Sequence, residues 1–259
     1  MRSNLHTAKK VNLATAHDIK LELDVRCQRT IERILRRAFP QTSILGEEGV
    51  VGDPNAESRW VVDPIDGTVN FAYGIPHACV SIALQVRSDK CRVTSDRSDT
   101  RSRGPFHVTR HTSHVTLLGV VYDPFQDELW TAIRGEPARL NGRTIHVSAR
   151  HLLADAIVTV GFAKSRTDLE ANLPYFIRLA RRMRKIRIMG SAGLGLTYVA
   201  SGRFDAYIER GINIWDIAAG GLIVECAGGK FWCEMNARDK TYRMVASSKA
   251  IFGRLPPLP

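Results

Sequence analysis

The feature that most constrains this chain is the hexapeptide Asp63-Pro-Ile-Asp-Gly-Thr68, which follows the apolar run Trp60–Val62. The apolar run predicts a buried strand that delivers two carboxylates at its C-terminal end. Pro64 removes one N–H group and stiffens the turn, while Gly67 allows a ligand to approach the backbone closely. Thr68 is expected to open a short helix, whose unpaired N–H groups form an anion site. This segment therefore offers oxygen ligands for a hard cation beside a cradle for phosphate.

Other acidic positions gain meaning only if the fold brings them to the hexapeptide. Glu47 and Glu48 follow a short strand candidate, Ser43–Leu45, and Asp216 stands at the start of a predicted helix. Taken alone, adjacent acids in a loop are usually solvated, and an acid at a helix start usually acts as a cap. If they converge, the carboxylates raise one another's pKa values, and Mg²⁺ relieves that repulsion through oxygen ligands.

Hydrophobic periodicity predicts strands and helices in both halves of the chain. Asp24 stands where a helix N-cap belongs, Pro40 follows the end of that helix, and Asn141-Gly142 predicts a hairpin turn. Strands are expected over 43–45, 60–62, 78–86, 117–122, 129–132, 156–160 and 204–208, and helices over 24–38, 169–183, 192–200 and 216–227.

Mixed elements of this kind favour an α+β or α/β fold built from packed layers. We expect an N-terminal half over 1–150, which carries the acidic pair and the hexapeptide, and a C-terminal half over 151–259, which carries Asp216. Residues 87–114 interrupt the pattern, because they are polar, charged and aperiodic, and they predict a disordered loop. His107, His111 and His114 have helical spacing there, but nothing around them predicts a helix, so we expect no metal site.

The composition excludes several classes of protein. Five cysteines without a CxxC pair indicate reduced thiols in a cytoplasmic protein rather than disulfides or a zinc site. No apolar run is long enough for a transmembrane helix, and the first ten residues lack the apolar segment of a secretory signal. The formal charge of +11 admits nucleic-acid binding, but it is spread along the chain. We therefore favour a basic surface that attracts anionic substrates.

The chain resembles the inositol monophosphatase family, and the matching segments cover most of residues 12–248 in family order. They are GEEG at 46–49, WVVDPIDGTVNF at 60–71, PHACVSIAL at 76–84, GVVYDP at 119–124, NG at 141–142, GSA at 190–192 and WDIAAG at 215–220. The resemblance implies a layered α-β-α-β-α sandwich of the sugar phosphatase type, usually a homodimer. Residues 87–114 do not look like the family, and the family's long helix before Asp24 has no counterpart here.

The resemblance also implies a magnesium site of two to three ions. By position, Glu47, Asp63 and the Ile65 carbonyl would hold one Mg²⁺. Asp63, Asp66 and Asp216 would hold a second, and a third, weaker ion would involve Glu47.

The remaining roles also follow from the resemblance. Asp24 and Thr68 would position and activate the attacking water, and Glu48 would support the metal site. Residues that would contact the substrate are Asp66, Gly67, Thr68, Ala192, Glu209 and Asp216.

These features predict a phosphatase that acts through metal-activated water, with inositol-1-phosphate as the leading substrate. Val69–Phe71 and Pro76–Leu84 resemble the inositol branch more than the histidinol-phosphate or 3′-phosphoadenosine branches. Fructose-1,6-bisphosphate or another sugar or nucleotide phosphate is the alternative substrate. An RNA-binding or regulatory protein on this scaffold is the alternative of another class.

Overall fold

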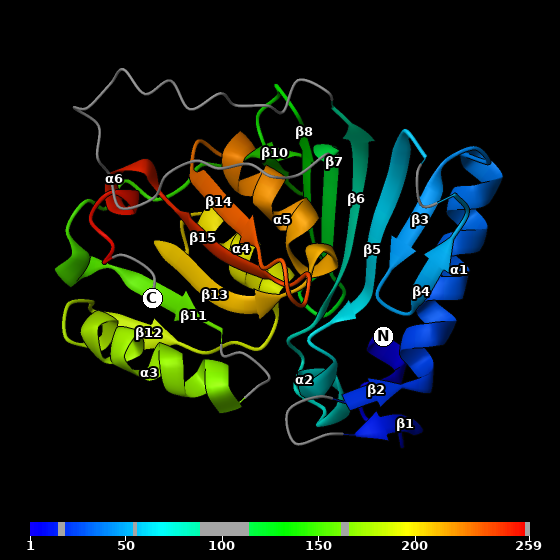
Figure 1. Cartoon of the computed structure of the whole chain (residues 1–259), viewed down its shortest axis with the longest axis horizontal. Helices are drawn as coiled ribbons and strands as arrows, with labels where there is room; N and C mark the ends of the chain where they lie inside the picture. Colours follow the sequence, from blue (N-terminus) through cyan, green and yellow to red (C-terminus); the bar gives the residue numbers. More distant parts are fainter. Residues whose placement is uncertain (15–18, 54–55, 89–113, 162–165, 257–259) are drawn as a thin grey trace.

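Two mixed β-sheets organise the molecule (Figure 1). The computed structural model describes residues 1–14, 19–53, 56–88, 114–161 and 166–256. The large sheet has eight strands in the order β10-β9-β8-β7-β6-β5-β3-β4, and the small sheet has five in the order β12-β11-β13-β15-β14. A short antiparallel pair, β1-β2, lies near the N-terminus.

The bounds of the elements are as follows. The strands of the large sheet are β3 (Ser43–Gly46), β4 (Gly49–Val51), β5 (Ser58–Asp66), β6 (Cys79–Arg87), β7 (His114–Asp123), β8 (Glu128–Ile133), β9 (Arg139–Leu140) and β10 (Arg143–Thr144). Those of the small sheet are β11 (Ile157–Val160), β12 (Lys185–Arg187), β13 (Ala206–Ile212), β14 (Lys230–Met235) and β15 (Tyr242–Ser247), and the N-terminal pair is β1 (Val11–Ala14) and β2 (Ile19–Leu21). The α-helices are α1 (Glu22–Ala38), α2 (Thr68–Ala72), α3 (Arg166–Ala180), α4 (Ala192–Ala200), α5 (Ile214–Cys226) and α6 (Lys249–Phe252), with 3-10 turns at Arg2–Asn4 and Leu153–Asp155.

The helices form three layers around the two sheets. Helices α4 and α5 lie between the sheets in one continuous core, which includes Trp130 of the large sheet and Tyr207 of the small sheet. Helices α3 and α6 pack on the other face of the small sheet, and α1 packs on the other face of the large sheet. The resulting order is α-β-α-β-α, which confirms the predicted sandwich.

The layers explain the composition of the central elements. Strand β6 alternates buried and half-buried residues, whereas β5 is buried on both faces from Trp60 to Asp66 because α1 and α5 cover opposite sides. Helix α5 lies against both sheets and is rich in alanine and glycine, which permit a close approach. A Cβ atom added at Gly119 in β7 would lie 2.7 Å from the Ala219 carbonyl oxygen of α5.

Three predicted details were wrong, for a common reason. Helix α1 begins at Glu22, so Asp24 is its third residue rather than its N-cap, and α5 begins at Ile214. Asp216 therefore holds the same third position in α5. Strand β13 runs on to Ile212, so Glu209 lies inside the strand rather than after its end. Periodicity locates an element better than it locates the element's ends.

Other predicted elements agree with the structure. The turn at Asn141-Gly142 joins β9 to β10, and both residues have positive φ angles, 47° and 78°, as a type I′ hairpin requires. Residues 89–113 of the predicted loop, with His107 and His111, lie outside the described residues, while His114 begins β7. Among the helices that the structure describes, none has both the length and the apolar character needed to cross a bilayer.

The close approach of α5 to β7 predicts the effect of a single methyl group. Gly119→Ala should lower the free energy of unfolding by about 1–3 kcal/mol, because its Cβ would overlap backbone rather than a mobile side chain. Gly253→Ala is the matched control, since its φ is −75° and no atom lies within 4 Å of the added Cβ. The control should change stability by less than about 0.5 kcal/mol in urea unfolding. Equal effects would contradict the packing of α5 on β7.

Candidate metal centre

The hexapeptide forms the C-terminal end of β5, where the strand leaves its regular pairing. The register between β5 and β6 shifts between Asp63 and Asp66, so both carboxylates face the interior side of the sheet end. The backbone N–H of Ile65 donates to Asp63 Oδ1 at 3.0 Å. Both aspartates are buried, at 1% and 7% exposure. The register shift thus places the Asp63 and Asp66 carboxylates on one side of the strand, whereas regular pleating would place them on opposite faces.

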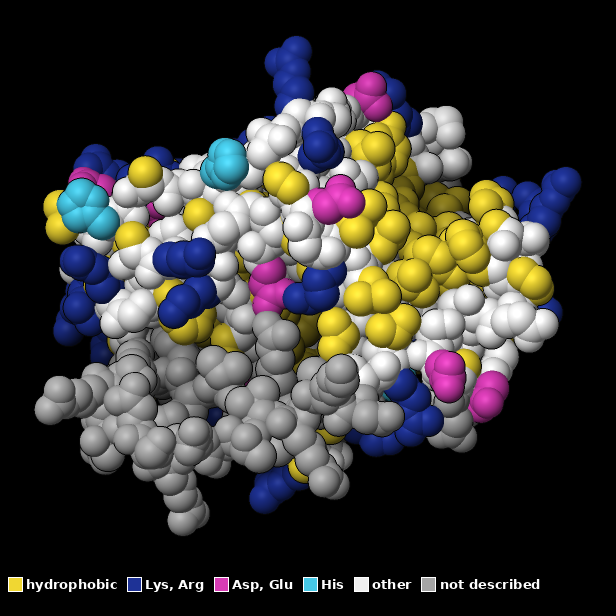
Figure 2. Space-filling view, turned by 90° about the horizontal axis from the view of Figure 1, so that it is seen from above, with side chains coloured by type: hydrophobic (Ala, Val, Ile, Leu, Met, Phe, Trp, Pro, Cys, Tyr) yellow, Lys and Arg dark blue, Asp and Glu magenta, His cyan; other side chains and the backbone are white. Residues whose placement is uncertain are grey.

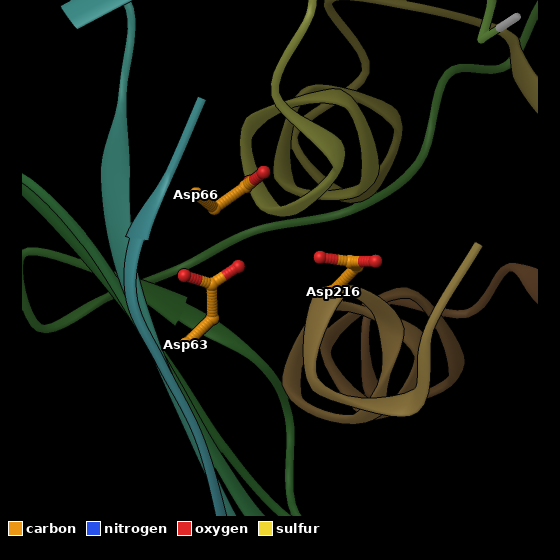
Figure 3. Close-up of side chains that lie close together, drawn as sticks. All are labelled: Asp63, Asp66 and Asp216. Carbon is orange, nitrogen blue, oxygen red and sulfur yellow. The ribbon is translucent and has the colours of Figure 1, made fainter. Parts of the chain in front are cut away.

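Asp216 brings a third carboxylate from the first turn of α5. Its Oδ2 accepts the backbone N–H of Asn213 at 2.8 Å, which holds the side chain beside the helix N-terminus. Ligand oxygens of Asp63, Asp66 and Asp216 all lie within 4.8 Å of one another. Figure 3 shows the three side chains converging from β5 and from the start of α5. Segments about 150 residues apart in the chain therefore share one site, as the family resemblance implied.

The electrostatics of the cluster fit a hard divalent cation. Burial raises the pKa of Asp63 well above its ordinary value, and repulsion from Glu47, Asp66 and Asp216 adds to the effect. Burial also raises the pKa of Asp216 well above its ordinary value, and repulsion from Asp66, Glu47 and Glu209 adds to the effect. A cluster of carboxylate oxygens that repel one another is the donor set that Mg²⁺ prefers. The residues present therefore fit the predicted metal.

Asp66 also belongs to a hydrogen-bond network at the start of α4. Its Oδ2 accepts from the Ser191 hydroxyl at 2.7 Å and from the Gly193 N–H at 2.6 Å, and its Oδ1 accepts from the Ala192 N–H at 3.1 Å. The Cys79 thiol contributes a weaker bond at 3.4 Å. Burial raises the pKa of Asp66, and these donors oppose the rise. The sequence analysis included the segment GSA at 190–192 but did not predict that Ser191 donates to Asp66, because the two residues are 125 positions apart in the chain.

Asp24 occupies a buried position close to the acidic turn between β3 and β4. Its Oδ2 accepts the Leu21 N–H at 2.7 Å, while its Oδ1 is buried without a hydrogen-bond partner. Burial raises the pKa of Asp24 to about 7, and repulsion from Glu47 and Glu48 contributes. Glu48 itself pairs with Lys20 at 3.1 Å. Lys20 therefore places a positive charge beside the acidic turn, and this charge partly opposes the rise in the pKa of Asp24.

A cavity of about 290 Å³ opens over the carboxylate cluster. The Thr68 hydroxyl, on its wall, donates to the Ile65 carbonyl oxygen at 2.8 Å. Asp24 and Glu48 do not line the cavity. The predicted residues that do line it are Glu47, Asp63, Ile65, Asp66, Gly67, Thr68, Ala192, Glu209 and Asp216.

Glu209 enters the cavity from the small sheet. The hydroxyl of buried Tyr207, two residues earlier on the same face of β13, donates to Glu209 Oε2. Gly161 leaves room for this carboxylate, because a Cβ atom there would overlap it. The role of Tyr207 was also missed, although its period-two spacing from Glu209 was a signal for it.

Asn70 joins the two sides of the cavity. Its side-chain amide donates to the His77 carbonyl oxygen at 3.0 Å and to the Met189 carbonyl oxygen at 2.8 Å. The hexapeptide helix α2 is thereby tied to the segment that leads into α4. Asn70 belongs to the segment 60–71 that carries the family resemblance, but no local pattern indicated this connection.

Comparison with known proteins agrees with the geometry. The model of the inositol monophosphatase family matches residues 1–91 and 110–252. The chain belongs to this family. Residues 92–109, which the match omits, fall within the segment whose sequence departs from the family pattern.

Similar proteins carry two kinds of name. The chain is 36% identical to the "Nus factor SuhB" of Pasteurella multocida, over 88% of this chain and 76% of that protein. It is 37% identical to the "Inositol-1-monophosphatase" of Rhizobium meliloti, over 85% and 74% respectively. The crystal structure of the extragenic suppressor protein suhB from Bartonella henselae superposes with a TM-score of 0.78 at 31% identity, over 95% of this chain and 86% of that one.

The raised carboxyl pKa values predict how metal-free stability depends on pH. The unfolded chain ionises at lower pH than the folded site, so stability should fall as pH rises above the ordinary carboxyl range. Asp216→Asn should weaken this fall and make the metal-free protein more stable at pH 8, by about 1.4 kcal/mol for each unit of pKa shift relieved. Urea unfolding in EDTA at pH 5 and pH 8 measures the effect.

Exposed Asp53 provides the control for that experiment. Asp53→Asn should leave the pH dependence unchanged, since this side chain lies outside the cluster. A loss of stability at pH 8 in metal-free Asp216→Asn would show that the site is not strained by like charges.

Proposed function

We propose that this protein hydrolyses inositol-1-phosphate to myo-inositol and phosphate in a reaction that requires Mg²⁺. The observation that carries the proposal is the convergence of three carboxylates beneath a cavity with polar walls. Membership of the inositol monophosphatase family supports the reaction class.

We assign the metal ligands as the family resemblance implies. Glu47, Asp63 and the Ile65 carbonyl would hold one ion, Asp63, Asp66 and Asp216 a second, and a third would involve Glu47. Bound Mg²⁺ acidifies water and stabilises negative charge on the transferring phosphoryl group. All five residues line the same cavity, which supports the assignment.

The chain's own groups would then orient the attacking water. Because the Thr68 hydroxyl donates to the Ile65 carbonyl oxygen, its oxygen remains able to accept a hydrogen bond from water. Asp24 has an unpartnered Oδ1 and a pKa near 7, which suits a group that takes up a proton at neutral pH. The backbone amides of Gly67 and Thr68 would bind the phosphate. Glu48, which pairs with Lys20 outside the cavity lining, would support this arrangement.

The opposite wall would bind the alcohol part of the substrate. Glu209 can accept hydrogen bonds from hydroxyl groups but repels phosphate, so it favours a polyol at this end of the cavity. Ala192, Asp66 and Asp216 complete the surface. Fructose-1,6-bisphosphate or another sugar or nucleotide phosphate is the alternative substrate. A phosphate-release screen over inositol phosphates, fructose-1,6-bisphosphate, histidinol phosphate and phosphoadenosine phosphate distinguishes them.

A second candidate function is binding of RNA or of a transcription complex. It is favoured by the name of the SuhB relatives and by exposed basic residues around α3 and β12, which are Arg181, Arg182, Arg184, Lys185 and Arg187. RNA affinity that falls with salt and persists in Asp63→Asn would support this role without excluding catalysis. The homodimer implied by the family resemblance also stays a prediction.

Removal of one central carboxylate should abolish turnover. Asp63→Asn takes away an oxygen donor that both proposed metal sites share, so we expect a loss of at least about 100-fold in kcat with the fold retained. Wild-type activity should likewise disappear in excess EDTA and return with Mg²⁺. Phosphate release measures the turnover, and circular dichroism measures whether the fold is retained. Full turnover in EDTA, or near-normal rates in Asp63→Asn, would refute the metal assignment, and Asp53→Asn is the matched control.

Glu209 should determine substrate preference rather than the rate of chemistry. Glu209→Gln should weaken a hydrogen bond to a substrate hydroxyl, at a cost of about 0.5–1.5 kcal/mol that appears mainly in KM. The variant is compared on inositol-1-phosphate and on glycerol-2-phosphate, which has fewer hydroxyls. Equal losses on both substrates would indicate a structural or metal-linked role instead.

A further inference from the structure

Helix α1 packs on the large sheet, yet the two residues of this helix that are buried are both polar. They are Asp24, at 2% exposure, and Gln28, at 3%, and they lie one turn apart on the same face of the helix. Burying an amide costs free energy unless its donor and acceptor atoms are hydrogen-bonded. The reason for a glutamine at this position must therefore lie in the contacts of its side chain.

The Gln28 amide holds the acidic turn between β3 and β4. Its Oε1 accepts the backbone N–H of Glu48 at 2.8 Å, and its Nε2 donates a longer bond to the Gly49 carbonyl oxygen at 3.4 Å. The Nε2 also donates to Glu32 Oε1 at 2.8 Å, one turn further along α1. A Cβ atom added at Gly46 would lie 2.3 Å from Oε1, so the amide lies directly against the backbone of the turn.

These contacts lie on both sides of Glu47, which is a proposed metal ligand and lines the carboxylate cavity. The two adjacent glutamates form the two-residue loop of the β3–β4 hairpin. The Glu47 N–H donates to the Val62 carbonyl oxygen at 3.1 Å, and Val62 directly precedes Asp63. The backbone of Glu47 is therefore held by β5 on one side and by Gln28 on the other.

The neutral charge of this amide suits an acidic turn. Burial raises the pKa of Asp24, and repulsion from Glu47 and Glu48 raises it further, so a carboxylate at position 28 would add to that repulsion. Lys and Arg side chains are spread over the face of the molecule in Figure 2, but a cation at position 28 would compete with a metal ion for Glu47. A glutamine supplies a donor and an acceptor without net charge.

We propose that Gln28 is a positioning residue that holds the backbone of Glu47 where its carboxylate can bind a metal ion. The inference rests on the proposed function, which makes Glu47 a metal ligand. Loss of a partner that orients a metal ligand typically lowers metal affinity about 10- to 100-fold. Gln28 does not line the cavity, so it acts through the turn and does not contact the substrate.

Direct binding of Mn²⁺ to the full chain, measured by the electron paramagnetic resonance of the free ion, tests the proposal independently of turnover. Gln28→Leu replaces the amide by an apolar side chain of similar size and should weaken Mn²⁺ binding at least about tenfold. In the Glu47→Gln background the same change should alter Mn²⁺ affinity less than about twofold, because the ligand that it positions is already lost.

Phosphate release gives a second measurement. Gln28→Leu should need at least about tenfold more Mg²⁺ for half its maximal rate, while kcat at saturating Mg²⁺ stays within about threefold of the wild-type value, because every metal ligand is retained. A purely structural role of the glutamine would not produce this division between Mg²⁺ requirement and kcat.

Gln85→Leu is the matched control. Gln85 is also buried, at 4% exposure, and its amide bonds with Arg59 and Thr116 in the large sheet, outside the lining of the carboxylate cavity. The control should keep Mn²⁺ affinity within about twofold of wild type, even where it lowers the free energy of unfolding, because distant sites act independently.

Gly46→Ala is a second variant, which tests the proposal even if Gln28→Leu does not fold. It retains the glutamine, but its Cβ would overlap the amide and displace it from the turn. It should therefore weaken Mn²⁺ binding as well.

Wild-type Mn²⁺ affinity in Gln28→Leu or in Gly46→Ala would overturn the proposal, and so would an equal loss of affinity in Gln85→Leu. An equal effect of Gln28→Leu with and without Glu47→Gln would also overturn it, because the glutamine would then act on another group. Failure of the proposed function gives a different result, since Asp63→Asn would then bind Mn²⁺ as tightly as wild type, and both inferences would fall.

Discussion

The mutual repulsion of buried carboxylates is the constraint on which the rest of this structure depends. Asp63, Asp66 and Asp216 lie close together, burial raises the pKa of all three, and repulsion from neighbouring carboxylates raises the pKa values of Asp63 and Asp216 further. Such a cluster is unfavourable by itself, and the surrounding fold must hold it in place. Backbone and side-chain donors do so by orienting each carboxylate, most completely at Asp66.

The layered architecture explains how segments far apart in the chain meet at this point. Helices α4 and α5 lie between the two sheets, so the start of each helix reaches the bulged end of β5. Small residues make this possible, because Gly119 lets α5 approach β7 and Gly193 leaves room for Cys79 and Asp66. The site is therefore a consequence of close packing in the central layer, and its precision depends on that packing.

Different helices cover the two faces of the large sheet. In the part of the chain that the structure describes, its inner face is buried against α5 and supports the cavity, while α1 packs on its outer face over β3 and β5. Strand alternation is the same on both faces, so the sequence of β6 to β8 alone predicts a core on each side. Only the arrangement of the helices shows that the described segments cover these two faces differently.

The sequence by itself predicted an acidic site that fits a metal ion, because the carboxylate spacing and glycine turn of the hexapeptide, and the apolar run before it, are local properties. It also predicted most elements, since their periodicity is local as well. Tertiary structure decided the rest. It made Asp24 and Asp216 the third residues of their helices and placed Glu209 within β13. It also brought Ser191 and Tyr207 to the acidic side chains that they orient. Packing between distant segments decides where helices and strands end, and no local pattern encodes that packing. The same is true of long-range contacts, such as the hydrogen bond between Asp66 and Ser191, which are 125 residues apart.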